Sequence, residues 1–168
     1  MPEAFIHTNA EEIAALMKAK EKEMAYALKG EGEQVARDMQ ADYKRTTATW
    51  SHQPTFEKIV DVQADGSFSA LVGTDDRIYT YVDQGTSPHI ITPKRPGYPL
   101  RFASGYRAKT RPGVLGSSGG GPFGPDRFAM LVRHPGTKAR NFTKMIFDKH
   151  RQLSLRRIVR RLQEVWGK

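Results

Sequence analysis

The sequence predicts an α+β fold: an N-terminal helix packed on a small antiparallel β-sheet, followed by a long Gly/Pro loop and a basic C-terminal helix. Two changes of pattern carry this prediction. Apolar residues repeat with helical spacing up to about residue 47, alternate as in strands from about residue 55, and return to helical spacing at residue 141. No helix fits between the expected strands, so the sheet should be antiparallel. We expect one domain over residues 1–168.

The first helix is predicted over residues 8–47. Thr8 or Asn9 can cap it, and acidic residues follow in its first turn. Gly30 and Gly32 predict a kink, or a break between two helices. The apolar residues recur on one stripe at Ile13, Leu16, Met17, Met24, Ala27, Leu28, Val35, Met39 and Tyr43.

The sheet is predicted within residues 55–137 and should contain about four strands. Segments rich in β-branched and aromatic residues indicate strands at 56–63, 66–72, 78–82, 100–102 and 128–132. Turn sequences separate the first three of these segments, at residues 64–66 and 73–76.

Residues 110–125 contain six glycines and three prolines, which exclude a helix or a central strand. We predict a loop that protrudes from the sheet. Ordering so many glycines costs roughly 1–2 kcal/mol per residue, with few apolar groups to offset it. The loop should therefore become ordered only against a neighbour, through Val114, Leu115 and Phe123.

The last helix is predicted over residues 141–166, with Asn141 as its N-cap and a possible break where Ser154 could cap a second helix. Leu162, Val165 and Trp166 form an apolar stripe beyond what a small sheet must cover, which favours self-association. Basic residues occupy much of the remaining surface, at Lys144, Lys149, Arg151, Arg156, Arg157, Arg160 and Arg161.

The net charge of +9 is concentrated at the end of the chain. Residues 138–168 carry ten Lys or Arg against two Asp or Glu, whereas residues 1–50 carry seven against nine. Such a basic segment indicates contact with nucleic acid or an acidic protein surface, the alternative being a solvated helix face.

The composition argues against most kinds of chemistry. Cysteine is absent, so disulfides, thiolate metal sites and cysteine nucleophiles are excluded. The sequence has no apolar run long enough for a membrane span and no secretory signal, so we expect synthesis in the cytoplasm. His89 and His134 could approach each other near Asp83 to bind a metal, but bonding to turn backbone is the ordinary role of such histidines. We expect no cofactor and no enzymatic activity.

Two turn sequences are the most specific signals in the chain. They read YVDQGTSPHIITPK at residues 81–94 and VRHPGTKARNF at residues 132–142. In each, glycine permits a positive φ and threonine can bond back to the backbone. We predict structural turns in which Phe142 is buried and Gly136 sits where a side chain is disfavoured. The residues assigned to these turns are Asp83, Gly85, Thr86, His89, Pro93, His134, Pro135, Gly136, Thr137 and Phe142.

The two sequences together resemble those of the tail-completion, or neck, proteins of long-tailed bacteriophages. That family pairs V-D-x-G-T-x-x-H-x-I-x-P with a later H-P-G-T-x-A-x-x-F, which stand here at residues 82–93 and 134–142. The resemblance covers roughly residues 10–150 and implies an N-terminal helix, a small antiparallel sheet and a helix after the second sequence. The family offers no catalytic residues to carry over.

The resemblance implies a structural virion protein of the phage neck, made in the host cytoplasm. It would form a homo-oligomeric ring, six-fold rather than twelve-fold, that contacts adjacent neck, adaptor and tail proteins. Contact with DNA in the channel is a further alternative. The long loop and the basic end leave open whether the chain is a tail-completion, terminator or adaptor component.

Two rival hypotheses remain. The first is a basic nucleic-acid-binding protein in which Arg156, Arg157, Arg160 and Arg161 neutralise phosphates. The second is a hydrolase or nuclease, for which the sequence offers no recognisable site. A free DNA binder should lose affinity steeply as salt rises, whereas a neck component should form rings and bind free DNA poorly.

Overall fold

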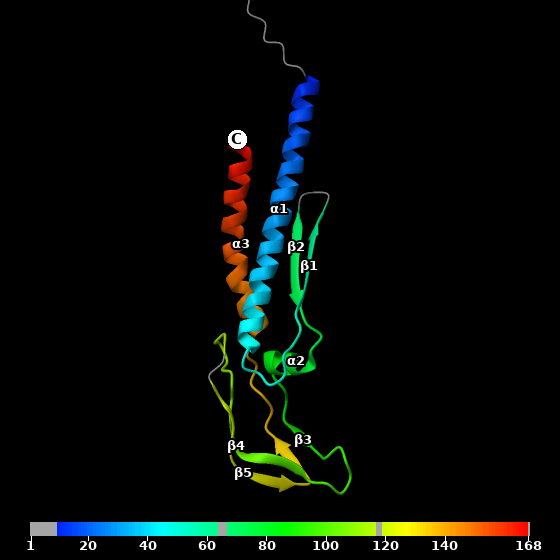
Figure 1. The fold of residues 1–168 in the computed structure, drawn as a ribbon, viewed down its shortest axis with the longest axis vertical. Coiled ribbons are helices and arrows are strands. Elements are labelled where there is room, and N and C mark those ends of the chain that lie inside the picture. The colour runs from blue at the N-terminus through cyan, green and yellow to red at the C-terminus, as the bar shows by residue number, and fades with distance from the viewer. Residues whose placement is uncertain (1–9, 64–66, 117–118, 168) are drawn as a thin grey trace, which may run out of the picture.

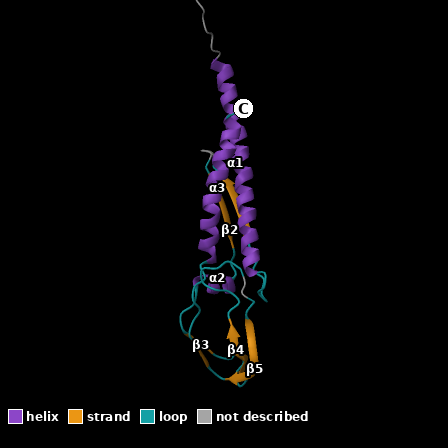
Figure 2. Cartoon of the chain, turned by 90° about the vertical axis from the view of Figure 1, so that its left-hand side faces the viewer, coloured by secondary structure: helices purple, strands orange, loops and turns teal. Residues whose placement is uncertain are grey.

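The computed structural model describes residues 10–63, 67–116 and 119–167 and has an α+β fold. Two long antiparallel helices, α1 (Ala10–Thr47) and α3 (Phe142–Trp166), lie side by side along an elongated molecule (Figure 1). The hairpin of β1 (Glu57–Val62) and β2 (Phe68–Gly73) packs on another side of α1. The remaining strands form the end of the molecule opposite the start of α1 (Figure 2).

The strands form three separate antiparallel pairs, so the prediction of one sheet of about four strands is wrong. In addition to β1–β2, β3 (His89–Ile91) pairs with β6 (Val132–His134), and β4 (Leu100–Arg107) pairs with β5 (Gly121–Ala129). Because each pair has only two strands, its apolar face must pack against a helix or another part of the chain to be stable. The β1–β2 hairpin packs against α1, whereas almost every residue of β5 is exposed.

The predicted strand at residues 78–82 is instead a helix, α2 (Arg77–Gln84). Asp76 caps it, because its carboxylate accepts a hydrogen bond of 2.7 Å from the backbone N–H of Tyr79. Tyr79 and Asp83 are four residues apart and are both buried. One helical face therefore turns inward, which the β-branched and aromatic content of this segment conceals.

Both long helices are continuous, so the predicted breaks are wrong. Gly32 is buried in α1, and a Cβ there would lie 2.9 Å from side-chain atoms of Val60 and of Phe68. This glycine admits the β1–β2 hairpin close to the helix rather than ending the helix. In α3, the Ser154 hydroxyl donates to the His150 carbonyl at 2.5 Å and caps no new helix. Thr8 and Asn9, the expected caps of α1, lie outside the described residues.

Residues 110–125 do not form one loop, which corrects a further prediction. Gly121 to Pro125 belong to β5, an exposed strand in which proline is tolerated. The Phe123 ring lies over Gly105 of β4, so close that a Cβ at Gly105 would be 2.5 Å from it. Leu115 is half-buried against the hydrophobic core, and Thr110 is buried. Parts of the segment are therefore held by their own chain.

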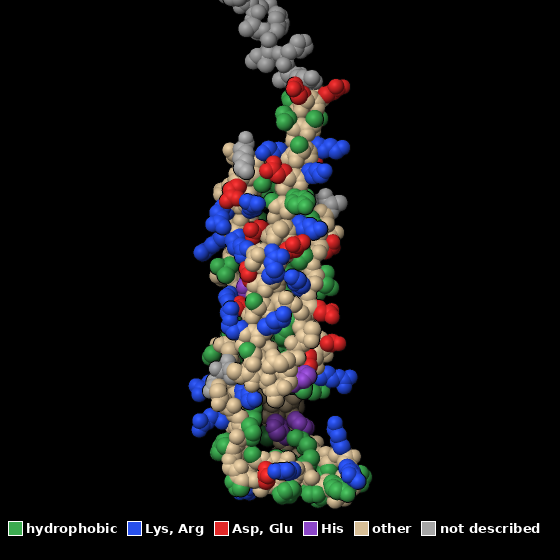
Figure 3. All heavy atoms as spheres, in the orientation of Figure 1, with side chains coloured by type: hydrophobic (Ala, Val, Ile, Leu, Met, Phe, Trp, Pro, Cys, Tyr) green, Lys and Arg blue, Asp and Glu red, His purple; other side chains and the backbone are tan. Residues whose placement is uncertain are grey.

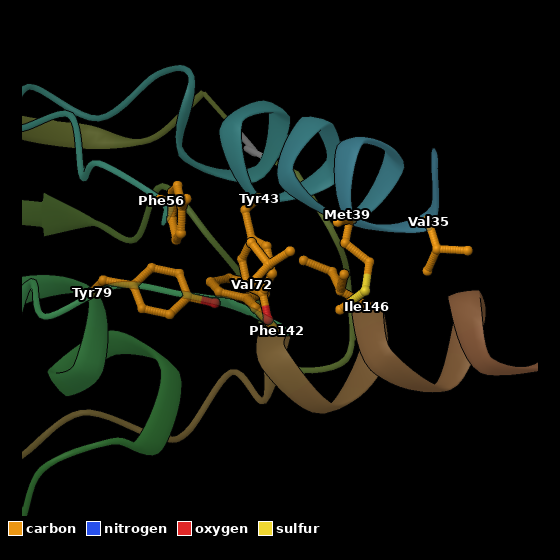
Figure 4. Packing of buried hydrophobic residues seen from close by; sticks show 9 residues of the cluster. Val35, Met39, Tyr43, Phe56, Val72, Tyr79, Phe142 and Ile146 are labelled. Atoms are coloured by element: carbon orange, nitrogen blue, oxygen red, sulfur yellow. The ribbon is translucent and has the colours of Figure 1, made fainter. Parts of the chain in front are cut away.

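The core lies where the two long helices meet the β1–β2 hairpin and α2 (Figure 4). Tyr43 stacks on Phe56 with ring centroids 4.8 Å apart, and Tyr79 meets Phe56 edge-on at 5.2 Å. Such aromatic pairs contribute about 0.5–1.5 kcal/mol each beyond the area they bury. The remaining members of the cluster are Val35, Ala36, Met39, Val72, Phe142 and Ile146.

The chain exposes 12,885 Å² of surface. A compact protein of 18.9 kDa would expose about 8,300 Å². The fifteen undescribed residues could supply at most about 2,400 Å² of this excess even if fully unfolded.

Among the described helices, none combines the length and apolar character needed to cross a bilayer.

Candidate functional site

The two turn sequences lie against each other and form one structural unit, here called the junction (residues 82–93 and 132–142). His89 stands opposite His134 where β3 pairs with β6. Beyond this pair, Thr86 N–H donates to the Thr137 carbonyl at 2.9 Å, and Thr137 N–H donates back to the Thr86 carbonyl at 3.1 Å. Segments about fifty residues apart in sequence are thus joined by backbone hydrogen bonds.

Gly85 and Gly136 allow the two segments of the junction to approach closely. Both have positive φ, +80° and +87°. A Cβ at Gly85 would lie 2.5 Å from the Thr137 carbonyl oxygen, and one at Gly136 would overlap the Thr86 carbonyl oxygen. Backbone conformation and space therefore both require glycine at these two positions.

Asp83 fixes the start of α3. Its buried carboxylate accepts a hydrogen bond of 3.1 Å from the backbone N–H of Thr143. Its backbone carbonyl accepts two more, from Arg140 at 2.9 Å and Asn141 at 3.0 Å. Asn141 holds the predicted N-cap position, but its φ is +57° and its side chain makes no capping bond. Asp83, at the end of α2, supplies the cap instead.

Three more side chains tie the junction to the rest of the fold. Phe142 is fully buried, as the sequence predicts. Tyr79 reaches from α2 to Thr143, with their hydroxyl oxygens 3.1 Å apart, and its burial raises the pKa of the phenol well above its ordinary value. Arg140, which the sequence did not single out, is buried, and its guanidinium donates to the Thr110 hydroxyl at 3.3 Å and the Lys138 carbonyl at 2.9 Å.

His89 and His134 come together, with ring centroids 4.9 Å apart, but the rings bond to turn backbone. The Nδ1 atom of His89 lies 2.9 Å from the Ser87 carbonyl, which can only accept, so this nitrogen carries the proton. The Nδ1 atom of His134 accepts the Gly136 N–H at 3.0 Å, which leaves the proton of a neutral ring on Nε2. The Asp83 carboxylate is occupied at Thr143. Within the described residues, no group of three or more potential ligands is placed to hold a metal ion.

The two prolines of the turn sequences lie just beyond the paired strands. Pro135 follows β6 and is exposed, while Pro93 stands two residues after the end of β3 and is half-buried. Proline cannot donate to a ladder of backbone hydrogen bonds, so it is suited to places where strand pairing ends.

Lys149 and Arg157, which the sequence analysis assigns to an interface, bind carboxylates of α1. Lys149 donates to the Asp42 carboxylate at 2.5 Å. Arg157 contacts Asp38 at 3.0 Å and Glu31 at 3.1 Å. These ion pairs join α3 to α1.

The other basic side chains of α3 fall into two groups. Lys144 pairs with Asp148, and Arg161 pairs with Glu164, along the helix itself. Arg151, Arg156 and Arg160 have no ion-pair partner within the described part of the chain. Figure 3 shows many Lys and Arg side chains along the edge of the molecule where α3 lies.

Asp42 is the most heavily bonded carboxylate between the two long helices. Besides Lys149, it accepts hydrogen bonds from His150 Nε2 at 2.8 Å and from Arg45 at 2.9 Å. Burial acts to raise the pKa of this carboxyl, but the hydrogen bonds and charges of Lys149 and His150 outweigh burial and hold it below its ordinary value.

The apolar groups assigned to the docking loop have different surroundings. Val114 is exposed, Leu115 is partly covered by the core, and Phe123 belongs to β5, where it is exposed.

No protein-family model, curated protein sequence or solved structure matches this chain.

Proposed function

We propose that this chain is a structural, non-enzymatic virion protein of a phage neck, which forms a ring joining the DNA-filled head to the tail. The observation that carries the proposal is the junction. The two sequences on which the resemblance rests are bonded to each other and set the start of α3. This arrangement supports the architectural role that the resemblance implies for their residues.

The exposed surface supports assembly. The chain exposes far more area than a compact protein of its mass, even after allowance for the undescribed residues. The exposed surface includes large apolar side chains such as Leu155, Val159 and Trp166, which neighbouring subunits could cover. The ring is proposed to have six copies rather than twelve, because phage tail tubes are commonly six-fold. Its other partners would be adjacent neck, adaptor and tail proteins.

The proposal is tested with the phage that encodes the chain. A stop codon in this gene should leave filled heads and finished tails unjoined in the lysate, as seen by electron microscopy. Addition of the purified chain should restore joining, and particles should then carry a ring of it at the neck, visible by antibody labelling. Normal infectious particles without the chain would rule the proposal out.

Arg151, Arg156 and Arg160, which have no ion-pair partner within the described residues, favour a second candidate, a protein that binds nucleic acid through α3. In that case the purified chain should bind duplex DNA, and the logarithm of its affinity should fall linearly with the logarithm of salt concentration. A mobility-shift titration at several salt concentrations distinguishes it from a neck subunit that binds free DNA poorly.

A further inference from the structure

An exposed apolar stripe, here called the outer stripe, runs along α3. Its members are spaced four, three and four residues apart, which is the seam of a helix that packs on another helix. Three of the four are 54–64% exposed, and Leu162 is half-buried. The residues that α3 buries, Phe142, Ile146, His150 and Val165, belong to other positions of the helix. The outer stripe consists of Leu155, Val159, Leu162 and Trp166, the last of which also contacts Met24 of α1 through its indole nitrogen.

The N-terminal turns of α1 also have no helix opposite them within the described residues. The end of α3 is marked by two contacts, from Lys20 Nζ to the Val165 carbonyl at 2.7 Å and from Trp166 Nε1 to Met24 Sδ at 3.2 Å. Residues 10–19 of α1, here called the overhang, extend past this point (Figures 1 and 2).

The overhang continues the helix-binding face of α1. Ile13 and Met17 lie on the same side as Leu28, Val35 and Met39, since their spacing follows the helical repeat. Leu28, Val35 and Met39 are buried, whereas Ile13, Leu16 and Met17 are 46–64% exposed. The overhang is therefore an amphipathic helix without a partner on its apolar side among the described residues.

Length and charge match the overhang to the outer stripe. The ten residues of the overhang span about 15 Å, and the stripe from residue 155 to residue 166 spans about 17 Å. The overhang carries Glu11 and Glu12 against one lysine, whereas residues 151–166 carry five arginines against one glutamate. Two outer stripes facing each other would bring their arginines together, so the charges disfavour contact between two α3 helices.

We propose that the overhang of one copy of this chain docks on the outer stripe of the next copy. Each copy would then use two different surfaces, one as donor and one as acceptor. Such a head-to-tail contact repeats from copy to copy and closes into a ring where the rotation permits. One contact of this length is small for a stable interface, so closure would be needed to hold the assembly together. This contact would hold neighbouring copies together in the proposed ring, and the inference rests on that proposed function.

Two variants of the full chain test the contact. The overhang variant carries Leu16→Lys and Met17→Lys, and the stripe variant carries Leu155→Glu and Val159→Glu. Both pairs of positions are exposed, so circular dichroism should show native helix content. A third variant, Leu153→Glu, changes an exposed leucine of α3 outside the stripe and serves as the matched control.

Sedimentation equilibrium should show wild type and the Leu153→Glu control as oligomers, and each of the other two variants as a monomer. Because the two monomeric variants can share only one contact, an equimolar mixture should stay monomeric at micromolar concentration and form a complex of two chains, and no larger species, only at about 1 mM. In that complex, the intact overhang of the stripe variant binds the intact stripe of the overhang variant. This rescue distinguishes a head-to-tail contact from an isologous one.

Any of three results would overturn the contact: monomeric wild type up to about 100 μM, variants that still assemble, or a mixture that stays monomeric even at about 1 mM. Loss of duplex DNA binding by the stripe variant, with its oligomers intact, would instead assign the surface to nucleic acid. Failure of this contact and failure of the proposed neck function would give different results. Neck rings in phage carrying both variant pairs would refute the contact alone, whereas particles complete without the chain would refute the neck function.

Discussion

The carboxylate of Asp83, in the last turn of α2, accepts a hydrogen bond of 3.1 Å from the backbone N–H of Thr143, in the first turn of α3. Sixty residues separate the two along the chain. The first turn of a helix has N–H groups without partners in the helix, and here a neighbouring helix supplies the acceptor. The short α2 therefore sets where the long α3 begins.

Replacement of Asp83 by alanine should lower the free energy of unfolding by about 1–2 kcal/mol, the usual effect of losing an N-cap. Asp83→Asn should cost less, because an amide oxygen can still accept the bond. Urea denaturation followed by circular dichroism measures both. Asn141→Gly is the matched control, since Asn141 has positive φ and no capping bond. An equal loss in the control would show that the cap is not supplied by Asp83.

Gly136→Ala should destabilise the protein by more than about 2 kcal/mol. The positive φ already disfavours alanine, and the added Cβ would overlap the Thr86 carbonyl oxygen. Gly113→Ala provides the comparison, because Gly113 also has positive φ but open space around its Cβ position. That variant should lose only about 1 kcal/mol. Similar midpoints of thermal unfolding for the two variants would contradict the close packing of the junction.

The ion pairs of Asp42 predict that the protein loses stability in acid. The pKa of Asp42 in the folded protein lies below the ordinary value of 3.8. The ionised carboxylate therefore stabilises the fold fully above that value, and the contribution is lost as the pH falls through the folded-state pKa. Asp42→Asn should be about 1–3 kcal/mol less stable than wild type near pH 6. The gap should narrow below about pH 4, as measured by urea denaturation across this range, and a constant gap would contradict the prediction.

The sequence predicts the elements whose own residues determine them. The long helices follow from apolar residues at helical spacing, and the buried position of Phe142 follows from the Gly-Thr turn before it. The positive φ of Gly85 and Gly136 has a local signal too, since glycine precedes threonine in each turn.

The errors concern features decided by distant residues. Gly32 looks like a helix breaker until the β1–β2 hairpin is seen against it. The α2 segment has the composition of a strand, and its helix depends on the Asp76 cap and on an inward face formed by Tyr79 and Asp83. A helix cap contributed by Asp83 from sixty residues away leaves no mark on the sequence near Asn141. The presence of Asp76 before Arg77 was the one local signal that could have revealed α2.

The last prediction separates arginines that hold the fold from arginines that are available to a partner. Arg157 lies between α3 and α1, where its guanidinium contacts Asp38 and Glu31. One oxygen of Glu31 is buried without a hydrogen bond and has the Arg157 Nε atom 3.1 Å away as its counter-charge. Removing the arginine would leave that oxygen uncompensated. Arg156 and Arg160 are exposed and make no ion pair within the described residues.

Arg157→Ala should therefore lower the free energy of unfolding by about 1–2 kcal/mol, whereas Arg156→Ala and Arg160→Ala should stay within about 0.5 kcal/mol of wild type. The double variant Arg156→Glu and Arg160→Glu should remain as stable as wild type yet sediment as smaller species, because it places acidic groups beside the outer stripe where the overhang brings Glu11 and Glu12. Urea denaturation and sedimentation equilibrium on the same samples measure both properties. A double variant that assembles like wild type would show that these arginines take no part in the contact, and a stable Arg157→Ala would show that its ion pairs do not hold α3 on α1.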